Sequence, residues 1–328
     1  MRIRCFQRQG GLVIGLDVGG TKIETLLVDE EGNILTTMRV PTPTGNGERV
    51  AQGVISTVRL VLREANLALD DVQAIGIGVP GQVEGGTVKR AVNLGIEAFP
   101  LAQYVQEHVQ GVPVVIENDV YTATLGAYSL LNRQEPVRHM LYLGIGTGIA
   151  AGVIIDGELY KGAHNMAGEI GHVVIDPNGE VCNCGARGCL ETLASGPAFT
   201  RQAMQAISAG QRTSLREVDP LNPRTIFQAA RDGDQVARLI VERATFYLAQ
   251  AIQWLLLCYD AEKIVLGGGI AQEGSALVQL LMRHLRVWHG QSKLADLVLN
   301  ESRLIARTST PRLGVLGAVV LAQQYLHQ

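Results

Sequence analysis

The sequence predicts an α/β protein made of two related domains, and three observations support this prediction. Its 328 residues are enough for two folded units of ordinary size. A hairpin pattern centred on a Gly-Thr pair occurs at Gly20 and again at Gly146, about 126 residues later. Short apolar runs alternate with amphipathic runs between the two hairpins, which is typical of a sheet covered by helices.

The first hairpin pattern lies near the N-terminus. The apolar run 12–16 predicts a strand, residues 17–22 predict a glycine turn, and the β-rich run 23–28 predicts a second strand. A turn over 29–33 and a third strand follow. We therefore expect a β-meander that opens a domain.

The segment between the hairpins alternates between helix and strand. Its pattern predicts a helix over 48–66, a buried strand over 72–79, a helix near 101–109 and a strand over 112–116. This order implies a sheet with helices packed against it.

The second hairpin pattern begins at Met140. Its glycine turn covers residues 144–148, the apolar run 149–155 predicts the next strand, and a turn at 156–157 precedes a short third strand. A period of this length is not that of a solenoid and favours two related domains. Chance similarity between two glycine-rich hairpins is the alternative.

The remaining chain is mainly helical. Amphipathic patterns predict helices over 197–209, 222–230 and 235–258. A further helix is expected over 275–287, and a last strand and a glycine-started helix over 314–326 close the chain. A predicted strand over 263–266 leads into the triplet Gly267-Gly268-Gly269.

The composition excludes several classes of protein. Hydrophobic residues make up 47% of the chain and charged residues 18%, with a net charge of −3, which excludes disorder and argues against nucleic acid or anionic membrane as a partner. No apolar run approaches about 18 residues, and the first one stops at Asp17, so we expect neither a membrane span nor a signal peptide. Five cysteines, an odd number, do not make a disulfide framework. The sequence thus predicts a soluble cytoplasmic protein.

Two glycine motifs resemble phosphate-binding signatures but fail in their context. The run 15–22 has Thr before Lys and a strand after it, whereas a P-loop needs Lys before Ser or Thr and then a helix. The run 76–81 has the dinucleotide spacing, but Pro80 interrupts it and a hairpin is predicted at 83–88. The two hairpin turns remain, and their backbone N–H groups could grip a triphosphate from both sides of a cleft.

Asp17 stands at the end of a buried strand. A carboxylate is costly there unless it holds a metal or joins a hydrogen-bond network. An Asp that caps the turn is an equally open interpretation.

His172, Cys182, Cys184 and Cys189 offer four nitrogen and sulfur ligands within a short stretch. Such a set suits tetrahedral zinc, and a full set of protein ligands indicates a structural site. A Cys182–Cys189 disulfide and ordinary buried thiols are the alternatives, of which the cytosol disfavours the first. Glu169 and Glu191 flank the cluster, so a zinc-fixed loop would hold both carboxylates ready to bind a polyol, although each alone is also an ordinary surface Glu.

These residues together resemble the ROK family of bacterial sugar kinases and repressors, over nearly the whole chain from residue 12. The resemblance rests on Asp17-Val-Gly-Gly-Thr-Lys22, Gly78-Val-Pro-Gly81, Glu117-Asn-Asp119, Leu143-Gly-Ile-Gly-Thr-Gly148, Ala167-Gly-Glu-Ile-Gly-His172, Cys182-Asn-Cys-Gly-Ala-Arg-Gly-Cys-Leu-Glu191 and Ala194-Ser-Gly196.

The resemblance implies an actin-like, ribonuclease H-like fold of two α/β domains with a ligand cleft between them. The smaller domain would comprise residues 1–120 and 313–328, and the larger one residues 121–312 with the zinc loop at 172–191. It further implies a homodimer, ATP with Mg²⁺, and a structural Zn²⁺ held by His172 and the three cysteines.

The resemblance also implies a role for individual residues. Asp119 would be the general base that accepts the proton of the attacking hydroxyl, and an N-cap role before a helix at 120–131 is the other interpretation of this residue. The sugar would contact Gly81, Asn93, Asn118, Asp119, Glu169, His172 and Glu191. ATP and Mg²⁺ would contact Asp17, Gly19, Gly20, Thr21, Lys22, Gly146, Thr147, Gly148, Gly268 and Gly269.

The implied activity is phosphorylation of the 6-hydroxyl of glucose by ATP. Kinases of N-acetylmannosamine or N-acetylglucosamine are the alternative, and fructose, mannose and allose also stay open. The chain departs from the family pattern after Asn93-Leu94, where residues 95–98 separate these residues from Phe99 and affect the expected sugar-entry loop. A DNA-binding repressor is disfavoured because only about a dozen residues precede the first glycine turn, too few for a helix-turn-helix.

Overall fold

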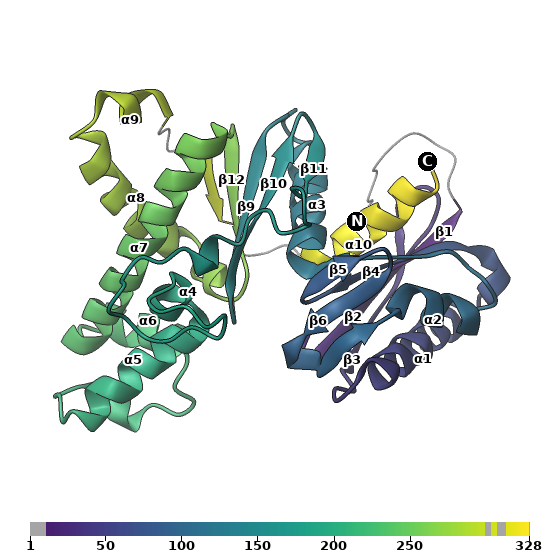
Figure 1. The fold of residues 1–328 in the computed structure, drawn as a ribbon, viewed down its shortest axis with the longest axis horizontal. Coiled ribbons are helices and arrows are strands. Elements are labelled where there is room, and N and C mark those ends of the chain that lie inside the picture. The colour runs from purple at the N-terminus through teal and green to yellow at the C-terminus, as the bar shows by residue number, and fades with distance from the viewer. Residues whose placement is uncertain (1–10, 299–302, 307–312, 328) are drawn as a thin grey trace. The chain divides into compact units, whose positions relative to one another are not determined.

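The structure is a computed structural model that describes residues 11–298, 303–306 and 313–327 (Figure 1). Its contacts divide the chain into two compact units. Unit 1 contains the described residues up to Pro136, the segment Leu159–Met166 and those of Pro311–Gln328; unit 2 contains those of Val137–Glu158 and Ala167–Thr310.

Unit 1 is built on a five-stranded sheet in the order β3-β2-β1-β4-β8. Its strands are β1 (Leu12–Val18), β2 (Lys22–Val28), β3 (Ile34–Pro41), β4 (Val72–Val79) and β8 (Val114–Asn118). The first three strands are antiparallel, whereas β1, β4 and β8 run parallel to one another. The carboxyl ends of β1, β4 and β8 therefore meet at one edge of the sheet.

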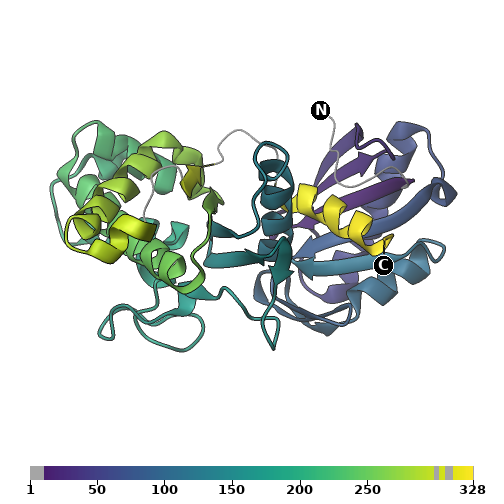
Figure 2. The same cartoon turned by 90° about the horizontal axis from the view of Figure 1, so that it is seen from above.

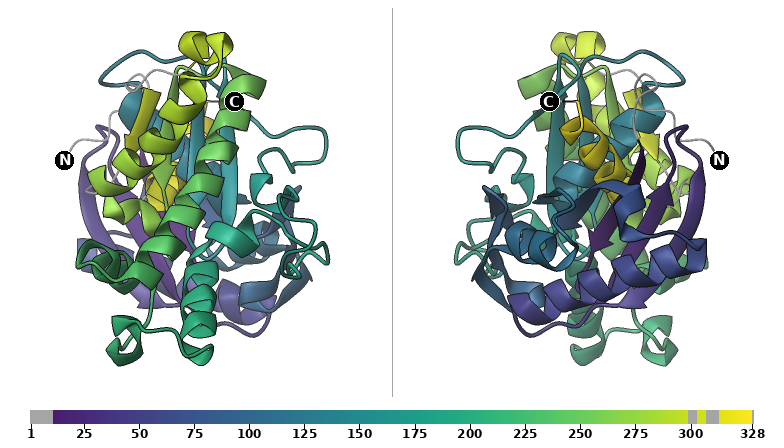
Figure 3. Two further views of the ribbon diagram at one scale, coloured as in Figure 1. Left: turned by 90° about the vertical axis from the view of Figure 1, so that its left-hand side faces the viewer. Right: turned by 90° about the vertical axis from the view of Figure 1, so that its right-hand side faces the viewer.

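Helices cover both faces of this sheet. Helices α1 (Gly47–Ala65) and α2 (Leu101–His108) enclose one apolar core and lie side by side in Figure 3, right panel. Helices α3 (Asp119–Leu131) and α10 (Leu313–Tyr325) lie together on the other face, as Figure 2 shows. A small sheet of β5 (Gln82–Glu84), β6 (Thr87–Ala91) and β7 (Ile96–Phe99) and the short helices η1 (Leu69–Asp71) and η2 (Val92–Leu94) complete the unit.

Close packing of α10 on the sheet depends on glycine. A Cβ atom at Gly76 of β4 would lie 1.9 Å from the carbonyl oxygen of Ala318 in α10. Any side chain at this position would push the helix away from the sheet.

Unit 2 repeats the sheet topology of unit 1. Its sheet has the strands β9 (Met140–Ile145), β10 (Ile149–Ile155), β11 (Glu158–Tyr160), β12 (Lys263–Gly267) and β13 (Leu304–Ala306), in the order β11-β10-β9-β12-β13. The last two residues of β11 begin the segment Leu159–Met166, which belongs to unit 1. In each unit a meander of three consecutive strands precedes two strands that continue the sheet in parallel. The prediction of two related domains is thereby confirmed.

Helices form most of the rest of unit 2. They are η3 (Ile170–His172), α4 (Glu191–Ala194), α5 (Gly196–Ser208), η4 (Ser214–Glu217), α6 (Pro223–Arg231), α7 (Gln235–Tyr259), η5 (Ile270–Glu273), α8 (Ser275–His289) and α9 (Lys293–Val298). Side chains of α5, α6, α7 and α8 enclose one large apolar core with β9, β10 and β12. Among the described helices, none is both long and apolar enough to cross a bilayer.

The expected α/β, actin-like fold class is confirmed, and several elements end where the sequence predicts. The strands at 72–79 and 149–155 match to the residue, whereas β8 lies two residues later than predicted and β7 was not predicted. The compact units also differ from the expected domains, because α3 and the segment Leu159–Met166 belong to unit 1. Helix α3 packs along α10, which explains its place there.

Candidate active site

The first glycine turn (residues 19–21) links β1 to β2 at the carboxyl edge of the unit 1 sheet. The backbone N–H of Gly19 donates to the carbonyl oxygen of Lys22 at 2.9 Å, and Thr42 holds the turn from outside through bonds to the carbonyl oxygens of Gly19 and Thr21. Gly20 and Thr21 are exposed. The turn is thus a fixed backbone loop that an anion can reach.

Asp17 lies two residues before this turn, on β1. Burial raises its pKa to about 7, with further increases from the negative charges of Asp119 and Glu24 and a decrease from Lys22. A Cβ atom at Gly314 would lie 2.5 Å from a carboxylate oxygen of Asp17, so glycine at the start of α10 makes room for this carboxylate. A divalent cation would relieve the crowding of negative charge.

Lys22 was expected to contact the nucleotide. In the structure its Nζ donates to Oε1 of the buried Glu24 at 2.6 Å, and the Arg39 side chain lies 3.6 Å from the same oxygen. In the structure Lys22 therefore neutralises the charge of Glu24.

Asn118 and Asp119 join the end of β8 to the start of α3. Asn118 is the N-cap: its Oδ1 accepts from the N–H groups of Val120 and Tyr121, and its Nδ2 donates to the carbonyl oxygen of Gly81 at 2.9 Å. Asp119 is the first residue of the helix, and its Oδ1 also accepts from Val120 N–H at 2.9 Å. The alternative interpretation of Asp119 as the N-cap is therefore corrected.

Two loops bring further predicted residues to the same edge of unit 1. Gly81 has φ +95°, and a Cβ atom there would lie 1.9 Å from the carbonyl oxygen of Arg90, so only glycine fits. Asn93 is exposed on η2, and a Cβ atom at Gly20 would contact its Cβ at 3.5 Å. Asn93 and the first glycine turn are thus neighbours.

The second glycine turn (residues 146–148) links β9 to β10 in unit 2. Gly146 N–H donates to the carbonyl oxygen of Gly148 at 2.9 Å, and the carbonyl oxygen of Gly146 accepts from the N–H of Gly196 at the start of α5. Glu191 reaches this turn, since its Oε2 accepts from Ile149 N–H at 3.0 Å. Thr147 at its tip is exposed.

The glycines expected near the adenosine lie beside the second glycine turn. A Cβ atom at Gly146 would lie 3.9 Å from the backbone nitrogen of Gly269. Gly268 has φ +83°, and a Cβ atom there would lie 2.4 Å from the carbonyl oxygen of Ile145, whereas Gly269 faces open space. The nucleotide contacts predicted at residues 146–148 and at Gly268 and Gly269 therefore lie close together in unit 2.

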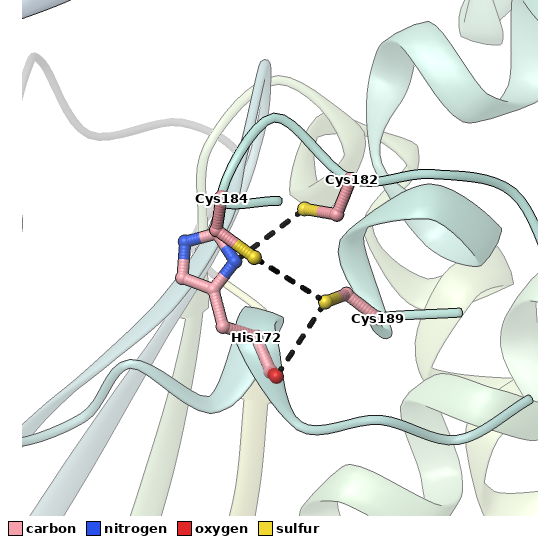
Figure 4. Close-up of side chains that lie close together, drawn as sticks. All are labelled: His172, Cys182, Cys184 and Cys189. Atoms are coloured by element: carbon pink, nitrogen blue, oxygen red, sulfur yellow. Dashed lines mark hydrogen bonds between the residues drawn. The ribbon is translucent and has the colours of Figure 1, made fainter. Parts of the chain in front are cut away.

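The predicted zinc ligands form a compact cluster, which we call the His/Cys cluster: His172, Cys182, Cys184 and Cys189 (Figure 4). Their ligand atoms all lie within 4.8 Å of one another, with 3.6 Å between Cys182 Sγ and His172 Nδ1 and 3.7 Å between Cys184 Sγ and Cys189 Sγ. Tetrahedral zinc with ligand bonds of about 2.0–2.3 Å requires separations of about 3.5–3.8 Å. The donor set and its spacing therefore fit zinc.

The three cysteines of this cluster are free thiols in the structure. The alternative of a Cys182–Cys189 disulfide is therefore not observed. Burial, together with hydrogen bonds to the other two thiols, raises the pKa of Cys189 to about 12. Three thiolates at this distance need a cation among them.

Glu169 and His172 place polar groups beside the His/Cys cluster. His172 Nε2, the nitrogen on the far side of the ring from Cys182, lies 3.8 Å from Glu169 Oε2. Burial raises the pKa of Glu169, His172 lowers it and Glu191 raises it, so the three side chains are electrostatic neighbours. A sugar hydroxyl is well matched to such a set of donors and acceptors.

One ion pair beside Asp119 was missed from the sequence. Lys161 Nζ donates to Oε2 of Glu117, which is 5% exposed. Glu117 follows three apolar residues in β8, which indicates a carboxylate that needs a partner, but nothing in the sequence identifies Lys161 as that partner.

Comparison with known proteins identifies relatives along the whole chain. Residues 13–325 match the ROK family. A protein named glucokinase from Streptomyces coelicolor is 33% identical over 96% of this chain and 98% of its own length. A protein named N-acetylmannosamine kinase from Haemophilus influenzae is 32% identical over 81% of this chain and 84% of its own length.

A solved structure of a ROK family glucokinase from Streptomyces griseus, in complex with glucose and AMPPNP, has a TM-score of 0.77 and 32% identity. The match covers 96% of this chain and 100% of that one. Matching sequence motifs, the repeated sheet and these relatives agree, and the chain belongs to the ROK family.

Proposed function

We propose that this protein is an ATP-dependent hexose kinase that phosphorylates the 6-hydroxyl of glucose. The observation that carries the proposal is the placement of Asp119 at the carboxyl edge of the unit 1 sheet, as an electrostatic neighbour of Asp17 and on the same edge as the first glycine turn. A base, a metal-binding carboxylate and a phosphate-binding turn are the parts that phosphoryl transfer to an alcohol requires. The relatives named glucokinase support this choice of reaction.

Asp119 acts as the general base. Its carboxylate accepts the proton of the sugar hydroxyl as that oxygen forms a bond to the γ-phosphorus of ATP. The bond between the γ-phosphorus and the β–γ bridging oxygen breaks, and ADP leaves with that oxygen. The N–H of Val120 accounts for one lone pair of Asp119 Oδ1 and fixes the carboxylate at the start of α3.

Backbone N–H groups and positive charge around the phosphates lower most of the barrier to phosphoryl transfer. The two glycine turns present N–H groups to the phosphates, and Gly268 and Gly269 allow the adenosine to approach the backbone. Mg²⁺, when bound, would neutralise phosphate charge, and Asp17 is the carboxylate that we propose to hold it through water. Since the pKa of Asp17 is about 7, a cation nearby also keeps it ionised.

The residues that we propose to bind the sugar belong to both units. Asn118 is fixed by Gly81 and by α3, and Asn93 lies beside the first glycine turn. Glu169, His172 and Glu191 supply acceptors and a ring nitrogen from unit 2.

The structural zinc would be held by His172 Nδ1 and three cysteine sulfurs. With zinc on Nδ1, the Nε2 nitrogen of His172 keeps its proton and donates toward sugar or Glu169. Zinc therefore shapes the sugar site without taking part in phosphoryl transfer.

Phosphorylation of N-acetylmannosamine is the second candidate, and the Haemophilus influenzae relative supports it. N-acetylglucosamine is the related alternative. The distinction depends on the space beside the C2 substituent of the sugar. The proposal also includes a homodimer and a cytoplasmic location.

A coupled ADP-release assay tests the proposal with Mg-ATP and five sugars: glucose, mannose, fructose, N-acetylglucosamine and N-acetylmannosamine. We expect the highest kcat/KM with glucose and loss of turnover in Asp119→Ala. A preference for an acetamido sugar would replace glucose as substrate, whereas no turnover of any sugar would contradict the kinase assignment.

A further inference from the structure

Glu117 is a buried carboxylate to which the proposed reaction gives no role. It lies in β8, two residues before Asp119, and only 5% of its surface is exposed. Its Oε1 accepts from the backbone N–H of Asn118 at 2.9 Å. An ionised carboxylate at this depth needs a cation to offset the loss of water.

Lys161 supplies that cation from a distant part of the sequence. Its Nζ donates to Oε2 of Glu117, and its own carbonyl oxygen accepts from the hydroxyl of Tyr121 at 3.4 Å. Tyr121 is itself buried and lies two residues after Asp119. Lys161 is therefore bonded to residues on both sides of the proposed base.

The chain segment around Lys161 also connects the Lys161–Glu117 ion pair to the residues that precede Glu169. Lys161 belongs to the segment Leu159–Met166, which is part of unit 1 although the residues before and after it belong to unit 2. The segment leads directly to Gly168, which is fixed on β10: Ala151 N–H donates to its carbonyl oxygen at 2.7 Å, and a Cβ atom there would lie 1.8 Å from the Ala151 carbonyl oxygen. Glu169 is the next residue.

We propose that Lys161 is a positioning residue for the kinase reaction. Through Glu117 and Tyr121 it fixes the backbone that carries Asn118 and Asp119, and it ties that backbone to the segment leading to Glu169. The inference rests on the proposed function. Without Lys161, Glu117 must take up a proton or turn toward solvent, and either change disturbs its bond to the Asn118 N–H.

Steady-state kinetics of Lys161→Met test this inference. We expect kcat to fall at least tenfold with a change of less than twofold in KM for ATP, because the hydrogen bonds described for the two glycine turns do not involve Lys161. Lys161→Arg, which keeps a cation near Glu117, is expected to retain kcat within threefold. The double variant Glu117→Gln/Lys161→Met removes the buried charge together with its partner, and its kcat should be at least threefold above that of Lys161→Met.

Lys89→Met is the matched control. Lys89 forms a 3.3 Å ion pair with Glu84 in the same unit, but both side chains are largely exposed, so we expect unchanged kcat. If Lys161→Met does not fold, Lys161→Gln, which keeps a hydrogen-bond donor for Glu117, is expected to fold and to lose kcat severalfold.

The outcomes separate the inference from the proposed function. An active wild-type protein whose Lys161→Met variant melts at a lower temperature but keeps kcat would show a merely structural ion pair and overturn the inference. Equal losses of kcat in Lys161→Met and Lys161→Arg would also overturn it. A wild-type protein that phosphorylates no sugar would overturn the proposed function and this role with it.

Discussion

The two glycine turns occupy equivalent places in two sheets of the same topology, yet each is served by a different carboxylate. The first turn has Asp17 on its own strand, two residues away. The second turn has Gly144 at the corresponding place, and Glu191 approaches it from α4 after the His/Cys cluster. Both sheets therefore have the same kind of backbone turn, whereas the carboxylate at each turn comes from a different part of the chain.

The carboxylates at the two turns therefore also depend on different parts of the structure. Asp17 is crowded by Asp119 and Glu24, so its state depends on the balance of charge in unit 1. Glu191 accepts a backbone hydrogen bond and follows Cys189 by two residues, so its position depends on the fold of the cysteine loop. Unit 1 should therefore respond to protons and Mg²⁺, and unit 2 to zinc.

Zinc removal should have the largest effect, and it should act on unit 2. We expect Cys184→Ser to lose the metal, to destabilise unit 2 by several kcal/mol and to weaken sugar binding. Elemental analysis and thermal unfolding measure these effects, with Cys258→Ser as the control because Cys258 is exposed and lies outside the His/Cys cluster. Wild-type protein without about one zinc per chain would contradict the metal assignment.

Asp119→Asn should have the next largest effect, and it should act on the chemistry of unit 1. We expect kcat to fall roughly 10²–10⁴-fold, the usual contribution of a general base. Asn is nearly isosteric, so the fold and the affinity for an ATP analogue should stay close to wild type. Calorimetric titration with AMPPNP and steady-state kinetics measure the two quantities. A variant with near-normal kcat would remove Asp119 from this role.

Asp17 should make unit 1 sensitive to pH when Mg²⁺ is absent. Its pKa is raised from 3.8 to about 7, so the folded state holds a proton that the unfolded state releases, and stability is lost as pH rises through this window. Between pH 5 and pH 8 the wild type should lose on the order of 2 kcal/mol relative to Asp17→Asn. Urea unfolding of both proteins at the two pH values gives this difference, and parallel pH profiles would refute the buried state of Asp17.

Alanine substitutions in the two turns should have the smallest and most selective effects. A Cβ atom at Gly148 would lie 2.6 Å from Glu191 Oε2, so Gly148→Ala must displace Glu191 and break its bond to Ile149 N–H. Losing that bond corresponds to about 1 kcal/mol, or several-fold weaker glucose binding. A Cβ atom at Gly20 meets Asn93 only at an ordinary 3.5 Å, so Gly20→Ala should keep the melting temperature. Calorimetry with glucose and thermal melts compare the two, and equal effects would mean that Glu191 does not serve the second turn.

Local sequence patterns predicted those features whose causes are local. The strands at 72–79 and 149–155 are apolar runs bounded by turn residues, and the His/Cys cluster is recognisable because its ligands lie within a short stretch. Strand β7 was missed because it has four residues, of which only Ile96 is buried. Long apolar runs carry a clear signal, whereas short edge strands do not.

The other features that the sequence did not predict depend on contacts between residues far apart in the chain. The partner of Glu117 is decided by where the chain returns after β11, and the sequence around Lys161 carries no sign of that return. The assignment of α3 to unit 1 likewise depends on its packing along α10, nearly two hundred residues later, roughly the length of a domain. The roles of individual site residues came from the family motifs and await the experiments above.

The place of α10 has a consequence for synthesis of the protein on the ribosome. Val315, Leu316 and Val319 of this helix complete the apolar cluster that covers one face of the first sheet, against Val13 and Leu26. The first strands and α3 emerge early, but the part of that face that α10 covers stays exposed until residues 313–325 have been made. Unit 2 can therefore fold before unit 1 is finished, and a nascent chain that stalls late would expose a sheet surface suited to chaperones.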